Sequence, residues 1–242
     1  YLMGNEKPFQ LFQIKGNVNG GEFSPDGKKL AFTVNRGGHQ LLGIFENAKT
    51  PIHWIAPSFH RYSQPKWSPD GTQLAFIKTQ GGTGAAFPLL EPRHIPWEIW
   101  VADVQSGEGK MLWKAPETLR GSYRSGFFAF PSDQELIFES YHEGWQHLFA
   151  LNTSTQKVES LTPGNYMVEQ IKLSSDSKTI VFSGNTGPEK EDLDRRHIGV
   201  LDIASKKLTW KTSGNGIEAY PVALGNQGKL AFFSATPQRS HL

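Results

Sequence analysis

Three adjacent residues, Arg195, Arg196 and His197, carry the densest set of side chains in this sequence that could bind a ligand. Two cations beside a histidine can bind a carboxylate or a peptide carbonyl. On an extended strand Arg195 and His197 face one side and Arg196 the other. A structural alternative pairs one arginine with Asp192 or Asp194 and lets His197 hydrogen bond to backbone at a sheet edge. We predict all three residues as candidate substrate-binding residues.

A second segment supplies two carboxylates and another histidine. Glu139, Glu143 and His147 are predicted to face a substrate cavity, whereas Tyr141 and Trp145 are expected to pack in the interior. His142 and His147 are five residues apart and would face opposite sides of one strand, so they do not form a metal pair.

Catalytic and metal-binding motifs are missing from the sequence. It has no Gly-x-Ser-x-Gly elbow, and the serines of residues 121–126 stand at the wrong offsets. It has no His-Glu-x-x-His motif, and its acidic run at residues 189–194 lacks the spacing of a calcium loop. Zero cysteine excludes disulfides, zinc-thiolate sites and a thiol nucleophile. We therefore predict no catalytic residue, no metal and no cofactor.

The charge and hydropathy of the chain exclude two classes of partner. The formal net charge is +2, and basic residues cluster only in pairs, so no nucleic-acid surface is predicted. No run of 18 apolar residues exists, so nothing is predicted to span a membrane. The composition fits a cytoplasmic or a periplasmic location in a bacterium. The first residue is not methionine, which leaves room for an upstream segment.

A repeat predicts the elements that position these residues. Residues 23–32 read Phe-Ser-Pro-Asp-Gly-Lys-Lys-Leu-Ala-Phe, and residues 67–76 read Trp-Ser-Pro-Asp-Gly-Thr-Gln-Leu-Ala-Phe. Proline presets φ for a tight turn, aspartate can bond its own backbone, and glycine accepts a positive φ. Each copy therefore predicts a β-hairpin. Weaker copies end at Phe138, Phe182 and Phe232.

Further hairpins are predicted in the intervals between these copies, and an insertion is predicted at residues 81–96. The second hairpins pair residues 98–103 with 110–114, 147–152 with 158–161, and 198–202 with 208–210. Two hairpins per period give four antiparallel strands, which is one blade of a β-propeller.

We therefore predict an all-β fold, with residues 1–242 forming a single repeat domain of about five four-stranded antiparallel blades. Residues 8–14 are expected to form an outer strand of an earlier blade, and residues 235–242 to end just past an inner hairpin. We expect a piece of a larger, seven- or eight-bladed propeller rather than a closed five-bladed ring. Such an arc exposes apolar blade faces and strand edges, which favours self-association into a homo-oligomer.

The repeat alone indicates PD40 or TolB-like propellers, and four further segments are more specific. Together they resemble the N-terminal propeller of the prolyl oligopeptidase family (peptidase family S9), on its dipeptidyl-peptidase-IV-like and acylaminoacyl-peptidase-like side. The four segments are Ile99–Gly107, Glu139–Phe149, Leu161–Glu169 and Asp194–Ile198.

This resemblance implies a two-domain serine peptidase. A C-terminal α/β-hydrolase domain would carry Ser, Asp and His, and the propeller would admit only short peptides. In dipeptidyl-peptidase-IV-like members, paired propeller glutamates bind the free amino end of the substrate. No two glutamates are adjacent in this chain, so the resemblance does not extend to that pair. The expected partners are a peptide substrate and a hydrolase domain outside these 242 residues.

Two other functions compete with a propeller that gates and selects peptides. One is a TolB-like scaffold that binds a protein partner and has no enzymatic activity. The other is a closed ring with carbohydrate-processing carboxylates in its channel. The residues predicted on inner strands, Leu30, Phe32, Leu74 and Phe76, are apolar, which argues against such a channel.

Overall fold

The protein is described by a computed structural model that covers residues 10–82, 94–124, 126–186, 192, 194–225 and 228–235. The chain divides into two compact units, Tyr1–Leu119 and Arg120–Leu242, and each is described here by itself. The insertion predicted at residues 81–96 lies mostly outside the described residues. The prediction that all 242 residues form one repeat domain stays a prediction.

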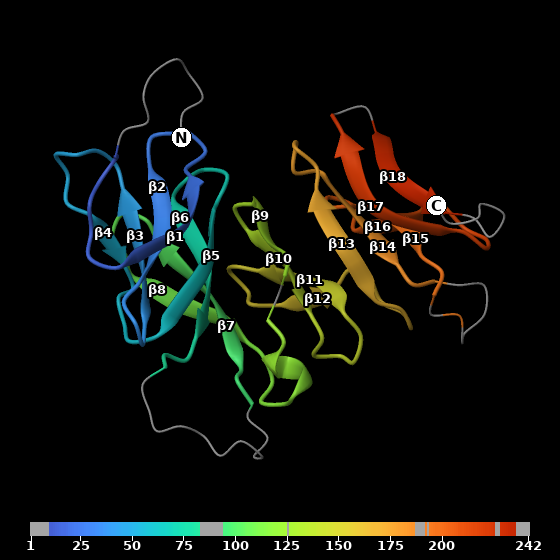
Figure 1. Ribbon diagram of the computed structural model, residues 1–242, viewed down its shortest axis with the longest axis horizontal. Helices are drawn as coiled ribbons and strands as arrows, with labels where there is room; N and C mark the ends of the chain where they lie inside the picture. The colour runs from blue at the N-terminus through green and yellow to red at the C-terminus, as the bar shows by residue number, and fades with distance from the viewer. Residues whose placement is uncertain are drawn as a thin grey trace. The chain divides into compact units, whose positions relative to one another are not determined.

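The first unit contains two four-stranded antiparallel groups (Figure 1). Each runs in chain order from its first to its fourth strand, and one parallel pair, Gln40 with Arg61, joins the two groups into one sheet. The first group is β1 (Asn17–Phe23), β2 (Leu30–Asn35), β3 (Gln40–Phe45) and β4 (His53–Ile55), and the second is β5 (Arg61–Trp67), β6 (Gln73–Thr79), β7 (Trp97–Asp103) and β8 (Gly109–Lys114).

The second unit contains two four-stranded sheets and one two-stranded sheet. A short 3-10 helix, η1 (Arg120–Ser122), precedes them. The third sheet is β9 (Phe128–Ser132), β10 (Glu135–Ser140), β11 (His147–Asn152) and β12 (Val158–Ser160). The fourth is β13 (Val168–Leu173), β14 (Thr179–Gly184), β15 (His197–Asp202) and β16 (Lys207–Trp210), and the last is β17 (Ile217–Leu224) with β18 (Lys229–Ala235).

These strands confirm the predicted hairpins at both positions of the repeat. Four groups of four antiparallel strands, followed by one further hairpin, are the blades predicted from the sequence. The strand predicted at residues 8–14 is wrong for residues 10–14, which have no strand pairing. Phe12 instead packs its ring on Phe32 and Phe45, so these residues cover the first sheet with side chains rather than extending it.

The turn of the repeat depends on a serine whose role the sequence did not reveal. In the copy at Ser68, the buried hydroxyl donates a hydrogen bond to Asp70 (2.6 Å) and accepts one from the Gln73 N–H (2.9 Å). Ser24 and Ser174 make the same pair of contacts in the first and fourth sheets. The serine bond holds the pKa of the Asp70 carboxyl below its ordinary value. These three inner hairpins are therefore closed by side-chain bonds within six residues.

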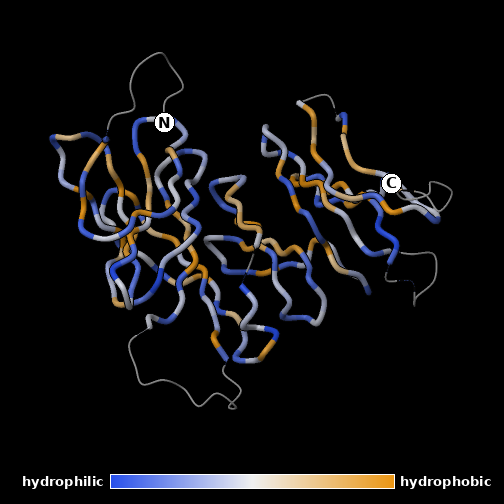
Figure 2. The backbone as a smooth tube through the Cα atoms, in the orientation of Figure 1, coloured by the Kyte–Doolittle hydropathy of each residue, from blue (hydrophilic) through white to orange (hydrophobic). Residues whose placement is uncertain are grey.

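The core follows the second strand of each four-stranded sheet. Phe32, Phe76, Phe138 and Phe182, the predicted repeat positions, are fully buried. Figure 2 shows hydrophobic stretches along the strands and hydrophilic ones at many connecting turns. One buried cluster lies between the two sheets of the first unit, and another joins the third and fourth sheets of the second. The only helix among the described residues is the three-residue η1, and none there is long and apolar enough to cross a bilayer.

Replacing Gly199 with alanine is expected to destabilise the fourth sheet. Gly199 pairs with Phe182, and a Cβ at Gly199 would stand 2.5 Å from that ring. The ring is fully buried and cannot move into solvent, so we expect a loss of about 1–3 kcal/mol in the free energy of unfolding. Urea titration measures this free energy. The control is Thr209→Ala at an exposed position, which is expected to change the free energy of unfolding by less than about 0.5 kcal/mol. Equal stability of Gly199→Ala and the wild type would contradict the prediction.

Candidate functional site

The predicted site residues of the second unit lie where one sheet is hydrogen bonded to the next. The Val168 N–H donates to the carbonyl of Gln146 (2.9 Å), which links the third sheet to β13. In the same way the Glu218 N–H donates to the carbonyl of Arg196 (2.8 Å), which links the fourth sheet to β17. Gln146 and Arg196 therefore occupy equivalent positions of the repeat, and we call these two places the sheet joints.

His147 follows the first sheet joint and is buried. Its Nε2 lies 3.1 Å from the carbonyl oxygen of Gly164, and its Nδ1 lies 3.3 Å from the Thr162 hydroxyl. Tyr166 packs edge-on against the imidazole. Burial lowers the pKa of His147, and the Gly164 contact offsets part of this effect. Both ring nitrogens are thus engaged inside the protein, and its predicted role in substrate binding stays a prediction.

His197 follows the second sheet joint and is also buried. Its Nδ1 lies 3.0 Å from the Oε2 of Glu218, which is equally buried. The alternative reading of the sequence predicted that His197 hydrogen bonds to the backbone at a sheet edge. Its partner is instead the carboxyl group of Glu218. The His197–Glu218 pair therefore fastens β15 to β17 through side chains as well as through the backbone.

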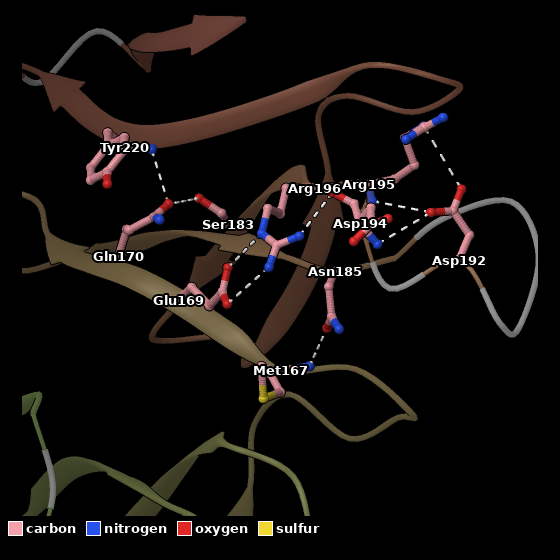
Figure 3. A network of polar contacts seen from close by, with 10 residues as sticks. All are labelled: Met167, Glu169, Gln170, Ser183, Asn185, Asp192, Asp194, Arg195, Arg196 and Tyr220. Atoms are coloured by element: carbon pink, nitrogen blue, oxygen red, sulfur yellow. Dashed lines mark hydrogen bonds and ion pairs between the residues drawn. The ribbon is translucent and has the colours of Figure 1, made fainter. Parts of the chain in front are cut away.

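The two arginines point to different partners, as the alternation of the strand predicts (Figure 3). Arg196 grips the carboxylate of Glu169 on β13 with two nitrogens, at 2.9 and 3.3 Å, and donates to the Asp194 carbonyl at 2.8 Å. Arg195 forms an ion pair with Asp192 at 3.8 Å, as the structural alternative expected. Arg196 is thus fixed by a two-point contact, which holds a guanidinium in one orientation.

Glu139 is the most unusual carboxyl of the site. It lies on β10 and is only 7% exposed. Burial raises its pKa to about 7, although backbone N–H groups of Phe127 and Gly126 donate to it and partly oppose the rise. The side-chain amide of Gln146 also donates to this carboxylate. Glu139 therefore titrates close to neutral pH, which ordinary glutamates do not.

Tyr141 and Glu139 are both hydrogen bonded to the side chain of Gln146. The Tyr141 hydroxyl donates to the Gln146 side chain, and the Tyr141 ring lies 5.3 Å from that of Tyr123. Burial raises the pKa of Tyr141, and the negative charges of Glu139 and Glu169 raise it further. Glu139 and the Arg196–Glu169 pair are therefore close enough to Tyr141 to act on it electrostatically, and we call this group of residues the acidic cluster.

Glu143 lies in the turn between β10 and β11. More than half of its side chain is exposed, and its Oε1 is 4.0 Å from the Nε2 of His142. Burial lowers the pKa of His142. Of the six predicted site residues, Glu143 has the most exposed side chain, so its carboxylate is accessible to a ligand.

Chemically, the acidic cluster is suited to bind a cation or an amine rather than to cleave a bond. It offers two carboxylates beside two tyrosine rings, and aromatic faces attract cations. Among the described residues, no group of three or more His, Asp or Glu side chains could hold a metal ion. The acidic run at residues 189–194 lies mostly outside the described residues, as does Ser125 of the near-elbow at 121–126.

Four members of the site were not among the residues predicted to bind substrate. Gln146 and Glu169 lie within the segments that carry the family resemblance, Glu218 lies outside them, and Tyr141 is predicted only to pack in the interior. One signal was present: Gln146-His147-Leu148 and Arg196-His197-Ile198 align when the repeats are superposed. That alignment would have marked Gln146 and Arg196 as equivalent before any coordinates were known.

The four-stranded antiparallel sheets and the repeat define a β-propeller fold. Residues 101–193 match the model of the dipeptidyl peptidase IV (DPP IV) N-terminal region. This match contains the third sheet, β13, β14 and Glu139. The predicted resemblance to the N-terminal propeller of dipeptidyl-peptidase-IV-like proteins is confirmed. No curated protein sequence matches the chain.

Solved structures share the fold at low sequence identity. A protein described as a dipeptidyl aminopeptidase IV from Bacteroides ovatus has a TM-score of 0.63 and 17% identity, over 90% of this chain and 36% of that one. TolB from Acinetobacter baumannii has a TM-score of 0.56 and 18% identity, over 95% and 54%. Oligogalacturonate lyase from Vibrio parahaemolyticus has a TM-score of 0.63 and 12% identity, over 94% and 65%. The chain thus spans less than two thirds of each of these proteins.

The four apolar residues that were predicted to argue against a carbohydrate-processing channel lie in the core, so they give no information about a channel. Leu30, Phe32, Leu74 and Phe76 lie on β2 and β6, the second strands of their sheets. Phe32, Leu74 and Phe76 are fully buried between neighbouring strands and sheets. Their apolar character reflects the core, because central strands are covered on both faces.

Proposed function

We propose that this propeller serves a serine peptidase of the prolyl oligopeptidase family by restricting entry to short peptides and holding their ends. The cleavage itself is assigned to an α/β-hydrolase domain of the same polypeptide, because these 242 residues have no Gly-x-Ser-x-Gly elbow. The observation that carries the proposal is the match of residues 101–193 to the DPP IV N-terminal region, which places Glu139 and Glu143 inside the matched segment.

Glu143 and the acidic cluster supply the proposed contacts to the peptide. A free amino terminus is a cation, and Glu143 offers an exposed carboxylate while Glu139 offers a buried one. A peptide amine would have to replace Gln146 as the donor to Glu139. Arg196 binds the Glu169 carboxylate with two nitrogens, so this further carboxylate of the acidic cluster is kept in one orientation.

The purified chain is expected to bind short peptides with a free amino terminus and to cleave none of them. Binding is measured by isothermal titration with tripeptides and with their N-acetylated forms, which lack the cation. We expect Glu143→Gln to weaken binding about tenfold, the size of one charge-assisted hydrogen bond, and Glu108→Gln, an exposed glutamate of the first unit, to leave it unchanged. The chain should release no chromophore from aminoacyl or dipeptidyl substrates and should not react with a fluorophosphonate probe.

Two outcomes would overturn the proposal. Equal affinity for free and N-acetylated peptides would remove the acidic cluster as an amine site. Labelling of a serine by the probe would show a nucleophile where the sequence has no motif for one.

A TolB-like scaffold for a protein partner is the second candidate. It is favoured by the similarity to TolB, which extends over 95% of this chain. The reading frame downstream of the Leu242 codon separates the two candidates. A Gly-x-Ser-x-Gly sequence there supports the peptidase, and a stop codon soon after Leu242 supports the scaffold.

A further inference from the structure

A pocket of about 400 Å³ lies between the two four-stranded groups of the first unit. Its walls come from segments that are far apart in the sequence: Lys29 before β2, the segment from Ile44 to His53 that ends β3 and begins β4, and Val104 with Gln105 after β7. Both walls belong to complete four-stranded groups, so neither is left open by an unfinished repeat. The volume suits a small molecule, since ligand pockets begin at about 300 Å³.

The floor of the pocket is apolar. Ile44 and Val104 are only 4% and 7% exposed and belong to the buried cluster between the two groups. Pro51 and Ile52 line the pocket beside them. Such a floor favours a ligand with a hydrocarbon side chain, because contact with it removes apolar surface from water.

Glu46 lines the pocket with a carboxylate that its own turn does not use. The equivalent residues of the other three four-stranded groups are Asp103, Asn152 and Asp202. Each of these side chains accepts at least one backbone N–H of the turn that follows. In the first group Asn47 takes this role instead, at 2.9 Å. Within the part of the chain that the structure describes, the Glu46 carboxylate has no hydrogen bond or ion pair.

Lys29 brings the opposite charge to the same pocket. Leu30 and Phe45 form the last ladder pair of β2 and β3, and Lys29 and Glu46 come directly after this pair on the two neighbouring strands. Their backbones therefore face each other. Even so, the Lys29 ammonium forms no ion pair within 4 Å with any described residue. The two opposite charges line one pocket without neutralising each other directly.

His53 supplies a third polar group. Its Nε2 is buried and has no hydrogen-bond partner, and a Cβ on Gly107 would stand 3.0 Å from this nitrogen, so that side of the ring is packed against the β7–β8 turn. Its Nδ1 makes no hydrogen bond with the described residues either. The buried His147 and His197 differ, because their rings contact partners inside the protein. The imidazole of His53 therefore has Nδ1 to offer a ligand.

We propose that this pocket binds a free α-amino acid with an apolar side chain. The ammonium group of the ligand contacts Glu46, its carboxylate contacts Lys29 and the Nδ1 of His53, and its side chain lies on the apolar floor. An α-amino acid carries both charges on one carbon atom, which matches two charged side chains that start from facing positions. A ligand with a single charge would be attracted by one of them and repelled by the other.

Isothermal titration with leucine and with its isomer ε-aminocaproate tests the proposal on the wild-type chain. The two compounds have the same atoms and the same charges, but ε-aminocaproate carries its charges at opposite ends of a linear chain. We expect leucine to bind at least about tenfold more tightly, the size of one charge-assisted hydrogen bond. Equal affinities, or no binding of leucine at millimolar concentration, would overturn the proposal.

Two substitutions in the pocket test the assigned contacts. Lys29→Met and Glu46→Gln each remove one charge and keep most of the side-chain shape, so each is expected to weaken leucine binding about tenfold. The matched controls are Lys28→Met, whose side chain is 78% exposed, and the exposed Glu108→Gln, and both should leave the affinity unchanged. Circular dichroism verifies that every variant keeps the β fold. Unchanged affinity in either pocket variant would contradict the site.

Two derivatives of leucine test the orientation of the ligand. N-acetyl-leucine lacks the cation, so Glu46→Gln should not weaken its binding further. Leucinamide lacks the carboxylate, so Lys29→Met should not weaken its binding further. The reverse pattern would show that the ligand does not contact these two residues as proposed.

A last comparison separates this pocket from the peptide contacts proposed at Glu143. Glu143→Gln should leave leucine binding unchanged, and Lys29→Met should leave tripeptide binding unchanged, because the two residues lie in different units. Loss of leucine binding in Glu143→Gln, with normal binding in Lys29→Met, would place the amino acid in the second unit and overturn this proposal. Failure of tripeptide binding alone would count only against the peptide proposal.

Discussion

Replacing His197 with leucine is expected to lower the free energy of unfolding by about 3 kcal/mol. The imidazole Nδ1 lies 3.0 Å from the Oε2 of Glu218, and both side chains are buried. Without the histidine, the carboxylate of Glu218 stays in the interior with one contact fewer. Removing one partner of a buried pair costs about 3–5 kcal/mol for this reason.

The repeat shows which side chains can replace both His197 and Glu218, because other sheets have apolar residues at the equivalent positions. Leu41 on β3 occupies the same position of the repeat as His197 on β15. Val168 on β13 occupies the same position as Glu218 on β17. The double variant His197→Leu, Glu218→Val therefore places at the second sheet joint two side chains that other sheets already have at the equivalent positions. It removes both polar groups together, so no buried charge remains. We expect the double variant to lose about 2 kcal/mol less than the sum of the two single losses, which is the coupling between the two side chains.

Urea unfolding of the wild type, the two single variants and the double variant measures this coupling. The change is expected in the second unit, where both residues lie. Strict additivity of the two single losses would show that the pair contributes no mutual stabilisation. In that case the backbone contact from Glu218 to Arg196 would be the bond that holds the joint.

The second prediction with a large expected effect concerns pH. We expect the protein to lose stability as the pH rises, because of the buried carboxyl group of Glu139. Its pKa is raised from 4.5 to about 7 in the folded protein because it is buried. The folded state then holds a proton that the unfolded state releases between pH 4.5 and 7. The stabilisation from this proton is complete below pH 4.5 and is lost as the pH rises through 7. A shift of this size corresponds to about 3 kcal/mol.

Glu139→Gln should remove this dependence, because glutamine keeps the shape and cannot ionise. The difference in free energy of unfolding between Glu139→Gln and the wild type should grow in favour of the variant by about 3 kcal/mol from pH 4.5 to pH 8. The difference isolates this one group from His142 and His147, whose lowered pKa values act in the opposite direction below pH 6.5.

Urea titrations at four pH values provide the measurement, with the exposed Glu143→Gln as the control. A constant difference between Glu139→Gln and the wild type across this range would mean that folding does not raise the pKa of Glu139. The peptide-binding proposal adds a further consequence. An amine binds the ionised carboxylate, so affinity should rise with pH through neutrality.

Much of the fold could be predicted because its signals are local. The hairpin at Ser68 is closed by bonds to Asp70 and Gln73, all within six residues, and the flanking apolar strands follow at once in the sequence. The same holds for the outer hairpins, in which Asp103 accepts from the N–H groups of Gln105 and Ser106. Such turns form wherever the residues occur, so their recurrence predicted the number and order of the sheets. The strand expected at residues 8–14 lacked any turn of this kind, and it is the one that failed for the described residues.

The candidate site depended on contacts that no local pattern contains. Arg196 meets Glu169 from 27 residues away, and His197 meets Glu218 from 21 residues away. The pKa of Glu139 is set by how completely neighbouring segments exclude water from it, and that burial exists only in the folded unit. The sequence alone therefore determined the repeat, the hairpins and the resemblance to a propeller, because turn chemistry acts over a few residues. Only the tertiary structure decided which charges are paired and which carboxyl is buried, because the stacking of one sheet on the next brings those partners together.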